Sequence, residues 1–254
     1  MRRLYPCILC ISALLTASLP DPLFAISAQE LIENTWNQLR GQASRGEVEM
    51  TIHRPSWERT MRMRTWTQGR SQSLIRILAP SKDKGNGTLK KWEDMWTYNP
   101  KINRVIKLPP SMMAQSWMGS DFSNNDLAKS DSILKDYTHS IVDTGTHQGK
   151  TVYVIKSVPK PESPVVWGMQ ELKIREDFIL LQETFFDEQE VPVKVMTTQD
   201  IRLLGGRLFP TVWTMRNSEN QDEFTRLQHV QLEFLNQLPK ELFTLRNLRN
   251  PGRL

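Results

Sequence analysis

Residues 47–52 read Glu-Val-Glu-Met-Thr-Ile, and residues 61–64 read Met-Arg-Met-Arg. Both stretches alternate apolar and polar side chains, which is the period of a half-buried β-strand. We therefore expect two successive strands of one sheet, each with a single apolar face. The side chains on these apolar faces are Val48, Met50, Ile52, Met61 and Met63.

Similar short segments recur along the rest of the chain. They lie around residues 74–78, 92–96, 105–108, 141, 152–155, 172–174, 179–186, 193–203, 208–215 and 230–234. Turn signals such as Gly149-Lys150 and Gly205-Gly206 separate several of them. About a dozen strands at short spacing predict a mainly β protein with one antiparallel sheet that is strongly curved or closed.

One helix is expected ahead of the strands. Ser27 and Glu30 have the spacing of a capping box, in which each side chain bonds the backbone of the other. Leu31, Ile32, Trp36 and Leu39 follow at roughly helical spacing, and a glycine ends the pattern at position 41. No second domain is apparent, so we expect a single domain over residues 26–254.

The strand pattern is interrupted at residues 109–136, which we call the insert. Connections of this length in a compact domain are often lids or binding loops. Residues 111–118 have helix-compatible spacing, and Asp121 is expected to fix a turn by accepting hydrogen bonds from nearby backbone amides. We expect a hinged flap over the sheet, and a static plug that completes the core is the alternative. The apolar side chains of the insert that are expected to face the sheet are Met113, Trp117, Met118 and Phe122.

Residues 1–25 are predicted to be a cleaved secretory signal peptide. Two arginines open the segment, residues 4–19 are uncharged and mostly apolar, and Ala25 is a small residue at the cleavage position. Cleavage after Ala28 and an uncleaved membrane anchor are the alternatives. The apolar run is short for an anchor, since a spanning helix needs roughly 20 apolar residues. The mature protein is therefore expected to be exported, as an envelope or extracellular protein.

Composition limits the chemistry that the mature chain can perform. Cys7 and Cys10 are the only cysteines and both precede the cleavage position, so we expect no disulfide and no thiol site. The net charge is +5 and the basic residues are not clustered, so nucleic acid is not an expected partner. No cofactor is implied.

Metal-binding patterns are weak in this sequence. None of the four histidines has the spacing of a metal motif; they are His53, His139, His147 and His229. Thioether sulfurs are soft ligands for copper(I), and Met112, Met113 and Met118 lie close together in the insert. Methionine is, however, also a common filler of adaptable apolar surfaces, so no metal site is expected.

A hydrolase is a further alternative. Asp121 and Asp126 of the insert are two carboxylates that could act as acid and base. Five positions apart in an irregular segment, such residues more often cap turns or helices. We therefore expect a protein that is not an enzyme.

Several ordered blocks resemble the LolA-like outer-membrane lipoprotein-sorting proteins. The most distinctive is Ser116-Trp117-Met118-Gly119-Ser120-Asp121-Phe122, followed by Asn125-Asp126-Leu127. The other similar blocks are residues 57–60, 73–77, 79–85, 95–100, 104–109 and 239–243. The resemblance is to a divergent branch and covers nearly all of the mature chain. It implies an incomplete antiparallel β-barrel with helices over its open side and a cavity for acyl chains.

These observations lead to one expected function and one rival. The expected function is a periplasmic carrier, a monomer, that holds lipid or lipoprotein acyl chains for outer-membrane sorting or transport. The rival is a non-enzymatic accessory subunit of an inner-membrane lipid exporter of the resistance-nodulation-division (RND) or ABC type. The residues expected to form the cavity and its lid are Val48, Met50, Ile52, Met61, Met63, Met113, Trp117, Met118 and Phe122.

Overall fold

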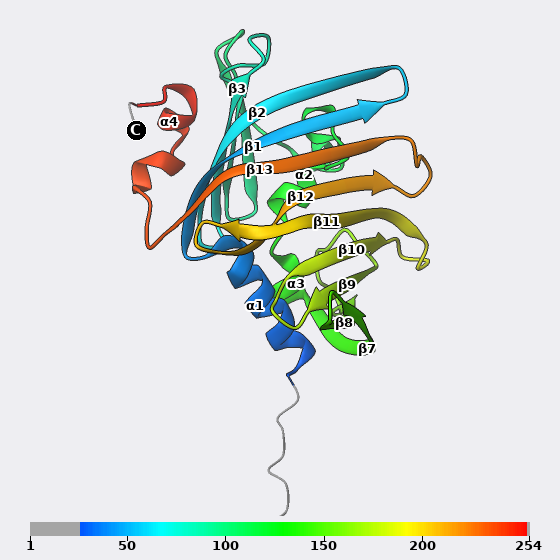
Figure 1. Ribbon diagram of the computed structural model, residues 1–254. Coiled ribbons are helices and arrows are strands. Elements are labelled where there is room, and N and C mark those ends of the chain that lie inside the picture. Colours follow the sequence, from blue (N-terminus) through cyan, green and yellow to red (C-terminus); the bar gives the residue numbers. More distant parts are fainter. Residues whose placement is uncertain (1–25, 253–254) are drawn as a thin grey trace, which may run out of the picture.

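A computed structural model describes residues 26–252 of the protein, and Figure 1 shows its arrangement. The predicted signal peptide, residues 1–25, lies outside the described residues. The chain opens with helix α1 (Ala28–Arg40), whose capping box between Ser27 and Glu30 is formed as predicted. Gly41 ends the helix with a positive φ of 63°, a conformation that glycine adopts at little cost.

Thirteen antiparallel strands form one sheet, which confirms the mainly β prediction. The first six are β1 (Ala43–Arg54), β2 (Trp57–Gln68), β3 (Gln72–Ala79), β4 (Gly87–Lys91), β5 (Asp94–Asn99) and β6 (Arg104–Lys107). The other seven are β7 (Tyr137–His147), β8 (Lys150–Pro159), β9 (Met169–Arg175), β10 (Leu180–Phe186), β11 (Pro192–Leu204), β12 (Arg207–Asn217) and β13 (Phe224–Leu235).

The strand order shows which strands form the two edges of the sheet. Strands adjacent in sequence pair within each half, except that β6 and β7 do not pair and β1 joins β13 to link the halves. The edges of the sheet are therefore β6 and β7. The sheet is open, so the incomplete barrel is confirmed and a closed barrel is wrong.

The register places the predicted apolar residues on one face. Val48 pairs with Met63 and Met50 pairs with Met61 between β1 and β2. On its other side β1 pairs Val48 with His229 and Met50 with Leu227 of β13. Because directly paired residues share a face, these side chains all project to the concave side.

The insert runs from one edge of the sheet to the other across the concave side (Figure 1). It contains η1 (Pro110–Met112), η2 (Trp117–Gly119), α2 (Asn124–Ala128) and α3 (Ser132–Asp136). Two short 3-10 turns thus replace the helix that the spacing suggested. Met118 has a positive φ of 54°, and Ser116 pairs with Ser123, so the chain reverses direction where a helix would have continued.

Three apolar clusters hold the fold together. The α1 cluster packs Leu31 and Ile32 with Ile133 of the insert against β7–β12. The methionine cluster packs Met50, Met61 and other residues of β1–β3 against Trp117 and Met112. On the opposite, outer face, the C-terminal elements η3 (Lys240–Phe243) and α4 (Leu245–Arg249) form the outer cluster with residues of β3 and β4.

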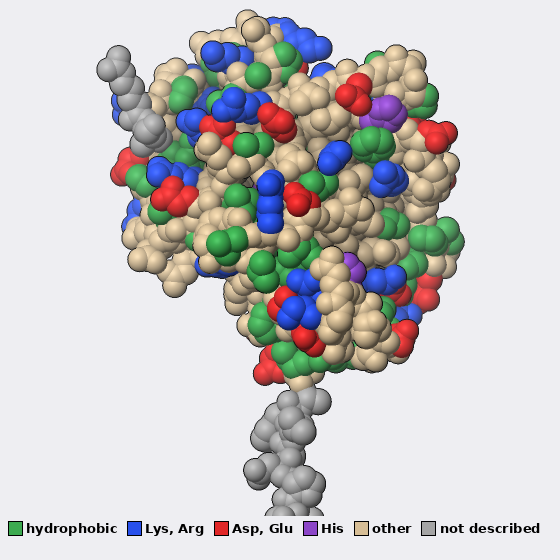
Figure 2. All heavy atoms as spheres, viewed as in Figure 1, with side chains coloured by type: hydrophobic (Ala, Val, Ile, Leu, Met, Phe, Trp, Pro, Cys, Tyr) green, Lys and Arg blue, Asp and Glu red, His purple; other side chains and the backbone are tan. Residues whose placement is uncertain are grey.

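Charges of both signs are interspersed over the face of the molecule seen in Figure 2. Among the described residues, no helix combines the length and the apolar character that crossing a membrane requires.

Candidate functional site

An apolar cavity of about 360 Å³ lies between the α1 cluster and the methionine cluster. Small-molecule pockets typically span roughly 300–1,000 Å³ and are mostly apolar, so this volume suits a ligand. The lining comes from the concave face of the sheet, from α1 and from the insert. Its apolar side chains include Trp36, Leu39, Val48, Met63, Met95, Trp117, Phe122, Leu127, Trp167, Leu180, Phe185, Met196, Phe209, Trp213, Met215 and Leu227.

The structure divides the nine predicted site residues into groups. Four of them line the cavity: Val48, Met63, Trp117 and Phe122. Three others, Met50, Ile52 and Met61, have no exposed surface and belong to the packed methionine cluster. Met113 and Met118 are partly buried against the same cluster. Met118 and Trp117 also line a second hollow of about 250 Å³ beneath the insert.

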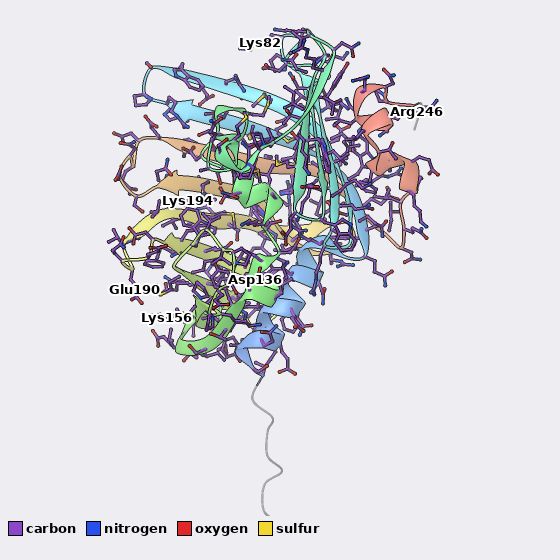
Figure 3. All side chains as sticks on the ribbon, turned by 180° about the vertical axis from the view of Figure 1, so that it is seen from behind. Lys82, Asp136, Lys156, Glu190, Lys194 and Arg246 are labelled. Atoms are coloured by element: carbon purple, nitrogen blue, oxygen red, sulfur yellow. The ribbon has the colours of Figure 1, made fainter. Side chains whose placement is uncertain are left out.

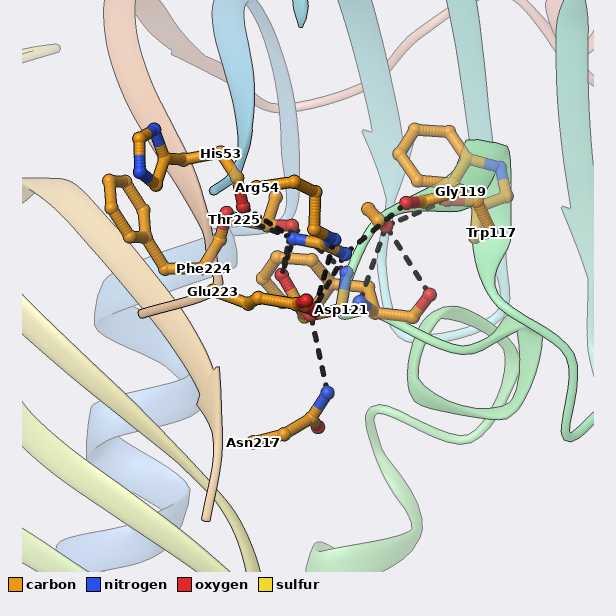
Figure 4. A network of polar contacts seen from close by, with 11 residues as sticks. His53, Arg54, Trp117, Gly119, Asp121, Asn217, Glu223, Phe224 and Thr225 are labelled. Atoms are coloured by element: carbon orange, nitrogen blue, oxygen red, sulfur yellow. Dashed lines mark hydrogen bonds and ion pairs between the residues drawn. The ribbon is translucent and has the colours of Figure 1, made fainter. Parts of the chain in front are cut away.

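The insert is tied to the sheet by a buried ion pair (Figure 4). Arg54 of β1 holds both carboxylate oxygens of Asp121, at 3.1 and 3.2 Å. Thr225 and Asn217 also donate to this carboxylate, at 2.6 and 3.3 Å, and Arg54 reaches Glu223 at 3.2 Å. The Asp121 side chain is 1% exposed. We call these residues the insert clamp.

The insert clamp corrects the expected role of Asp121. Its carboxylate accepts from side chains of the sheet and not from nearby backbone amides. Its own amide donates to Thr225 Oγ1 at 2.9 Å. The neighbouring Trp117 is 5% exposed and donates from Nε1 to Thr88 Oγ1 at 3.0 Å. These contacts favour the static plug over the hinged flap for residues 117–122.

A polar group interrupts the apolar lining on the β10–β11 side. Glu183 of β10 and Asp126 of α2 both line the cavity. Lys194 of β11 forms an ion pair with Asp126 and lies 4.8 Å from the ring centroid of Trp167. Figure 3 shows Lys194 beside the insert. Burial, and then the charge of Asp126, raises the pKa of Glu183 to about 8.

A second ionic group lies beside the cavity near α1. Arg40 and Lys90 line the cavity, and both form ion pairs with Asp131 of the insert, at 2.8 and 3.2 Å. Arg40 also donates to Ser130 Oγ, and Lys90 to the carbonyl oxygen of Arg70. Burial lowers the pKa of Lys90, and the charge of Asp131 opposes that shift.

His229 of β13 adds a neutral polar side chain to the lining. Its ring lies 5.0 Å from the ring of Phe209 and 5.6 Å from that of Trp213. Burial lowers the pKa of His229 to about 4, so the ring is uncharged at neutral pH.

Of the polar lining residues, Asp126 was singled out from the sequence, for acid–base chemistry, but Glu183 was not, although one signal existed. In β10, Glu183 shares the inward face with Phe185, because the two pair with Met196 and Lys194 on β11. A carboxylate at an inward position of an otherwise apolar strand face is unusual, because an isolated charge is costly to bury. No comparable feature of the sequence indicates that His229 and Lys90 line the cavity.

The geometry does not bring together an acid–base pair from the insert. Asp121 is bound by Arg54 and Asp126 by Lys194, so each carboxylate has its own cation. Within residues 26–252, no group of three or more His, Cys, Asp or Glu side chains has the geometry of a metal site.

Open antiparallel sheets of this shape, with helical segments over the concave side, define the LolA-like class. The structure is similar to a domain assigned to outer membrane lipoprotein sorting from Vibrio parahaemolyticus, with a TM-score of 0.76 and 19% identity. It is also similar to a LolA superfamily protein from Nitrosomonas europaea, with a TM-score of 0.72 and 20% identity. Each alignment covers 87% of this chain and 98% of the other.

A third similar structure is a DUF1329 family protein from Desulfovibrio piger, with a TM-score of 0.77, 22% identity, and coverage of 87% of this chain and 97% of that one. No curated protein matches the chain. A DUF1329-like family model, described as uncharacterized protein, matches residues 69–250. This match covers more than half of the chain, so the protein belongs to that family.

Proposed function

We propose that the protein is a periplasmic carrier that binds acyl chains of a lipid or lipoprotein in the cavity, for sorting or transport to the outer membrane. The observation that carries this proposal is the apolar cavity left between two packed clusters on the concave face. A core built only for stability would be close-packed there, because interiors leave few voids larger than a water molecule. The similar LolA superfamily structures support the same reading at the level of fold.

Burial of the chain would supply the binding energy. Each methylene removed from water contributes about 0.8 kcal/mol, so a single acyl chain offers enough to offset the cost of association. The lining also suits chains of variable shape, since it mixes aromatic rings with flexible methionines such as Met63, Met95 and Met196. No covalent step is needed for this function.

Solvent extraction tests the proposal. The mature protein is purified from its native envelope, washed, and extracted, and the extract is analysed by mass spectrometry. We expect lipid in stoichiometric amount from the wild type, and much less from a Met63→Asp variant that places a charge in the cavity wall. A lipid-free extract, together with binding to an inner-membrane RND or ABC exporter, would replace the carrier by the accessory role.

A further inference from the structure

Asp126 and Glu183, which we call the acidic pair, are two carboxyl groups in the wall of the cavity. They come from different elements, α2 and β10. Lys194 forms an ion pair with Asp126, and its positive charge lowers the pKa of Glu183. Glu183 is 6% exposed and the side chains of Asp126 and Lys194 are 9% and 4% exposed. Both carboxyl groups of the acidic pair are therefore buried in the protein, and both border the cavity.

The acidic pair has unused capacity to accept hydrogen bonds. Asp126 Oδ1 is buried and has no hydrogen-bond partner among the described residues. Burial and the charge of Asp126 raise the pKa of Glu183 to about 8, so at pH 7 its carboxyl group is mostly protonated and its carbonyl oxygen is an acceptor. A buried polar atom left without a partner costs about 1–3 kcal/mol, so such atoms are nearly always satisfied in the functional state.

The cations near the cavity, by contrast, are already engaged. Lys194 bonds Asp126 and lies over the rings of Trp167 and Phe185. Arg40 and Lys90 each have two acceptors. Their shared partner, Asp131, leaves a second buried acceptor, Oδ1, without a bond from the described residues. These three cations therefore do not satisfy Asp126 Oδ1.

We infer that the acidic pair receives the hydrogen-bond-donating head group, a hydroxyl or an amine, of an otherwise apolar ligand whose chain fills the rest of the cavity. The inference rests on the proposed function and names the chemistry of its ligand. A donor would satisfy Asp126 Oδ1 and bond Glu183. A carboxylate or phosphate head at the same place would set an anion against the Asp126 carboxylate and would leave Asp126 Oδ1 unbonded.

Three probes with one chain and different heads test the inference on the wild-type protein. Dodecylamine, dodecanol and dodecanoate are titrated at pH 7, below their micelle concentrations, and binding is followed by tryptophan fluorescence. We expect the amine, the alcohol, or both to bind about tenfold more tightly than dodecanoate, because one buried donor–acceptor bond is worth that factor. The tighter of the two donors identifies the head group as an amine or a hydroxyl.

Matched variants then locate the preference. Glu183→Met keeps approximately the size of the side chain but removes both of its oxygens, and we expect it to reduce the preference for a donor head about tenfold. Glu171→Met is the control, because Glu171 lies on neighbouring β9, one residue before the inward Leu172, and so faces outward. This control should keep the wild-type ranking. Far-UV circular dichroism confirms that both variants are folded.

The outcomes separate this inference from the proposed function. Equal binding of the three probes, or tightest binding of dodecanoate, would overturn the inference while the apolar cavity remained a chain-binding site. An unchanged ranking in Glu183→Met would also overturn it. Failure of all three probes to bind would contradict the proposed function as well.

Discussion

Met50 and Met63 lie on the same face of neighbouring strands but have different surroundings. Met50 has no exposed surface and is enclosed by the methionine cluster. Met63, at 3% exposed, belongs to that cluster and also lines the cavity. The pair therefore offers a comparison between a residue of the packed core and a residue of the site.

Aspartate at these two positions should have different effects. Met50→Asp leaves an unpaired charge in packed core, so we expect the free energy of unfolding to fall by about 3–5 kcal/mol. Met63→Asp can be hydrated from the cavity, so the expected loss is about 1–2 kcal/mol, with lipid binding abolished. Denaturant unfolding and lipid binding measured on both variants check this. Full lipid binding by a folded Met63→Asp variant would place the site elsewhere.

Glu183 should make the stability of the protein depend on pH. Its pKa in the folded state is about 8, above the ordinary value of 4.5 that applies in the unfolded chain. The unfolded chain therefore releases this proton first, and the contribution of Glu183 to stability falls as pH rises from about 4.5 to about 8. The limiting slope is about 1.4 kcal/mol per pH unit for one proton.

Glu183→Gln tests this dependence. The variant cannot ionise, so its stability relative to the wild type should increase steadily between pH 5 and pH 8 and stay level above that range. Below pH 4.5 the offset between the two proteins should not change with pH. Urea unfolding at several pH values gives the comparison, with Glu171→Gln as the control. A difference that is constant across the range would mean that Glu183 titrates normally.

Among the elements, the insert decides how much of the concave face is left open. It joins the two edge strands and contributes Trp117 and Phe122 to the cavity wall. The insert clamp fixes its turn through the buried pair of Arg54 and Asp121. Breaking such a pair by removing one charge leaves the other charge uncompensated, which is strongly destabilising.

Hydrogen exchange should report the insert clamp. In the wild type we expect the amides of residues 117–122 to exchange as slowly as those of β1 and β13, with or without lipid. Asp121→Asn removes the charge that Arg54 binds, so exchange in 117–122 should become faster while the central strands stay protected. The Trp117 amide, which donates to the Phe122 carbonyl at 2.7 Å, is a direct reporter. Exchange that is already fast in the wild type and slows on lipid addition would instead support a hinged flap.

The elements differ in how well the sequence predicts them. The alternation of apolar and polar side chains in residues 47–52 and 61–64 is sufficient to predict the two strands and the face that each turns inward. The two-residue repeat of a strand depends only on local sequence. The interior of the insert was predicted incorrectly, since the positive φ of Met118 breaks a spacing that looked helical. The alternation of Glu183 with Phe185 is a signal for its inward position, but the register shift between Leu180 and Gln182 interrupts the alternation along β10 and obscures that signal.

Only four of the nine predicted site residues line the cavity, because its position depends on contacts that local sequence does not reveal. Val48 and Met50 share a strand face, but only Val48 lines the cavity. Which part of a face stays uncovered depends on how β1 joins β13 and on where the insert packs. Both are contacts between segments that are far apart in sequence, so neither follows from local periodicity.

At the scale of the whole molecule, the open sheet and its edge-to-edge insert leave an apolar space that the chain does not fill. Part of the outer face, over β3 and β4, is covered by the C-terminal elements, with Leu242, Phe243 and Leu248 buried there. The two faces therefore have different roles. The outer face completes the core, and the concave face supplies the cavity of about 360 Å³.

Photo-crosslinking shows whether an acyl chain occupies the cavity. The mature protein is irradiated with a phospholipid whose acyl chain carries a diazirine, and the labelled residues are mapped by mass spectrometry. We predict labelling at Val48, Met63, Trp117 and Phe122, and its loss when unlabelled lipid competes. Labelling confined to the outer face, at exposed residues such as Leu203 or in the C-terminal elements, would contradict the account.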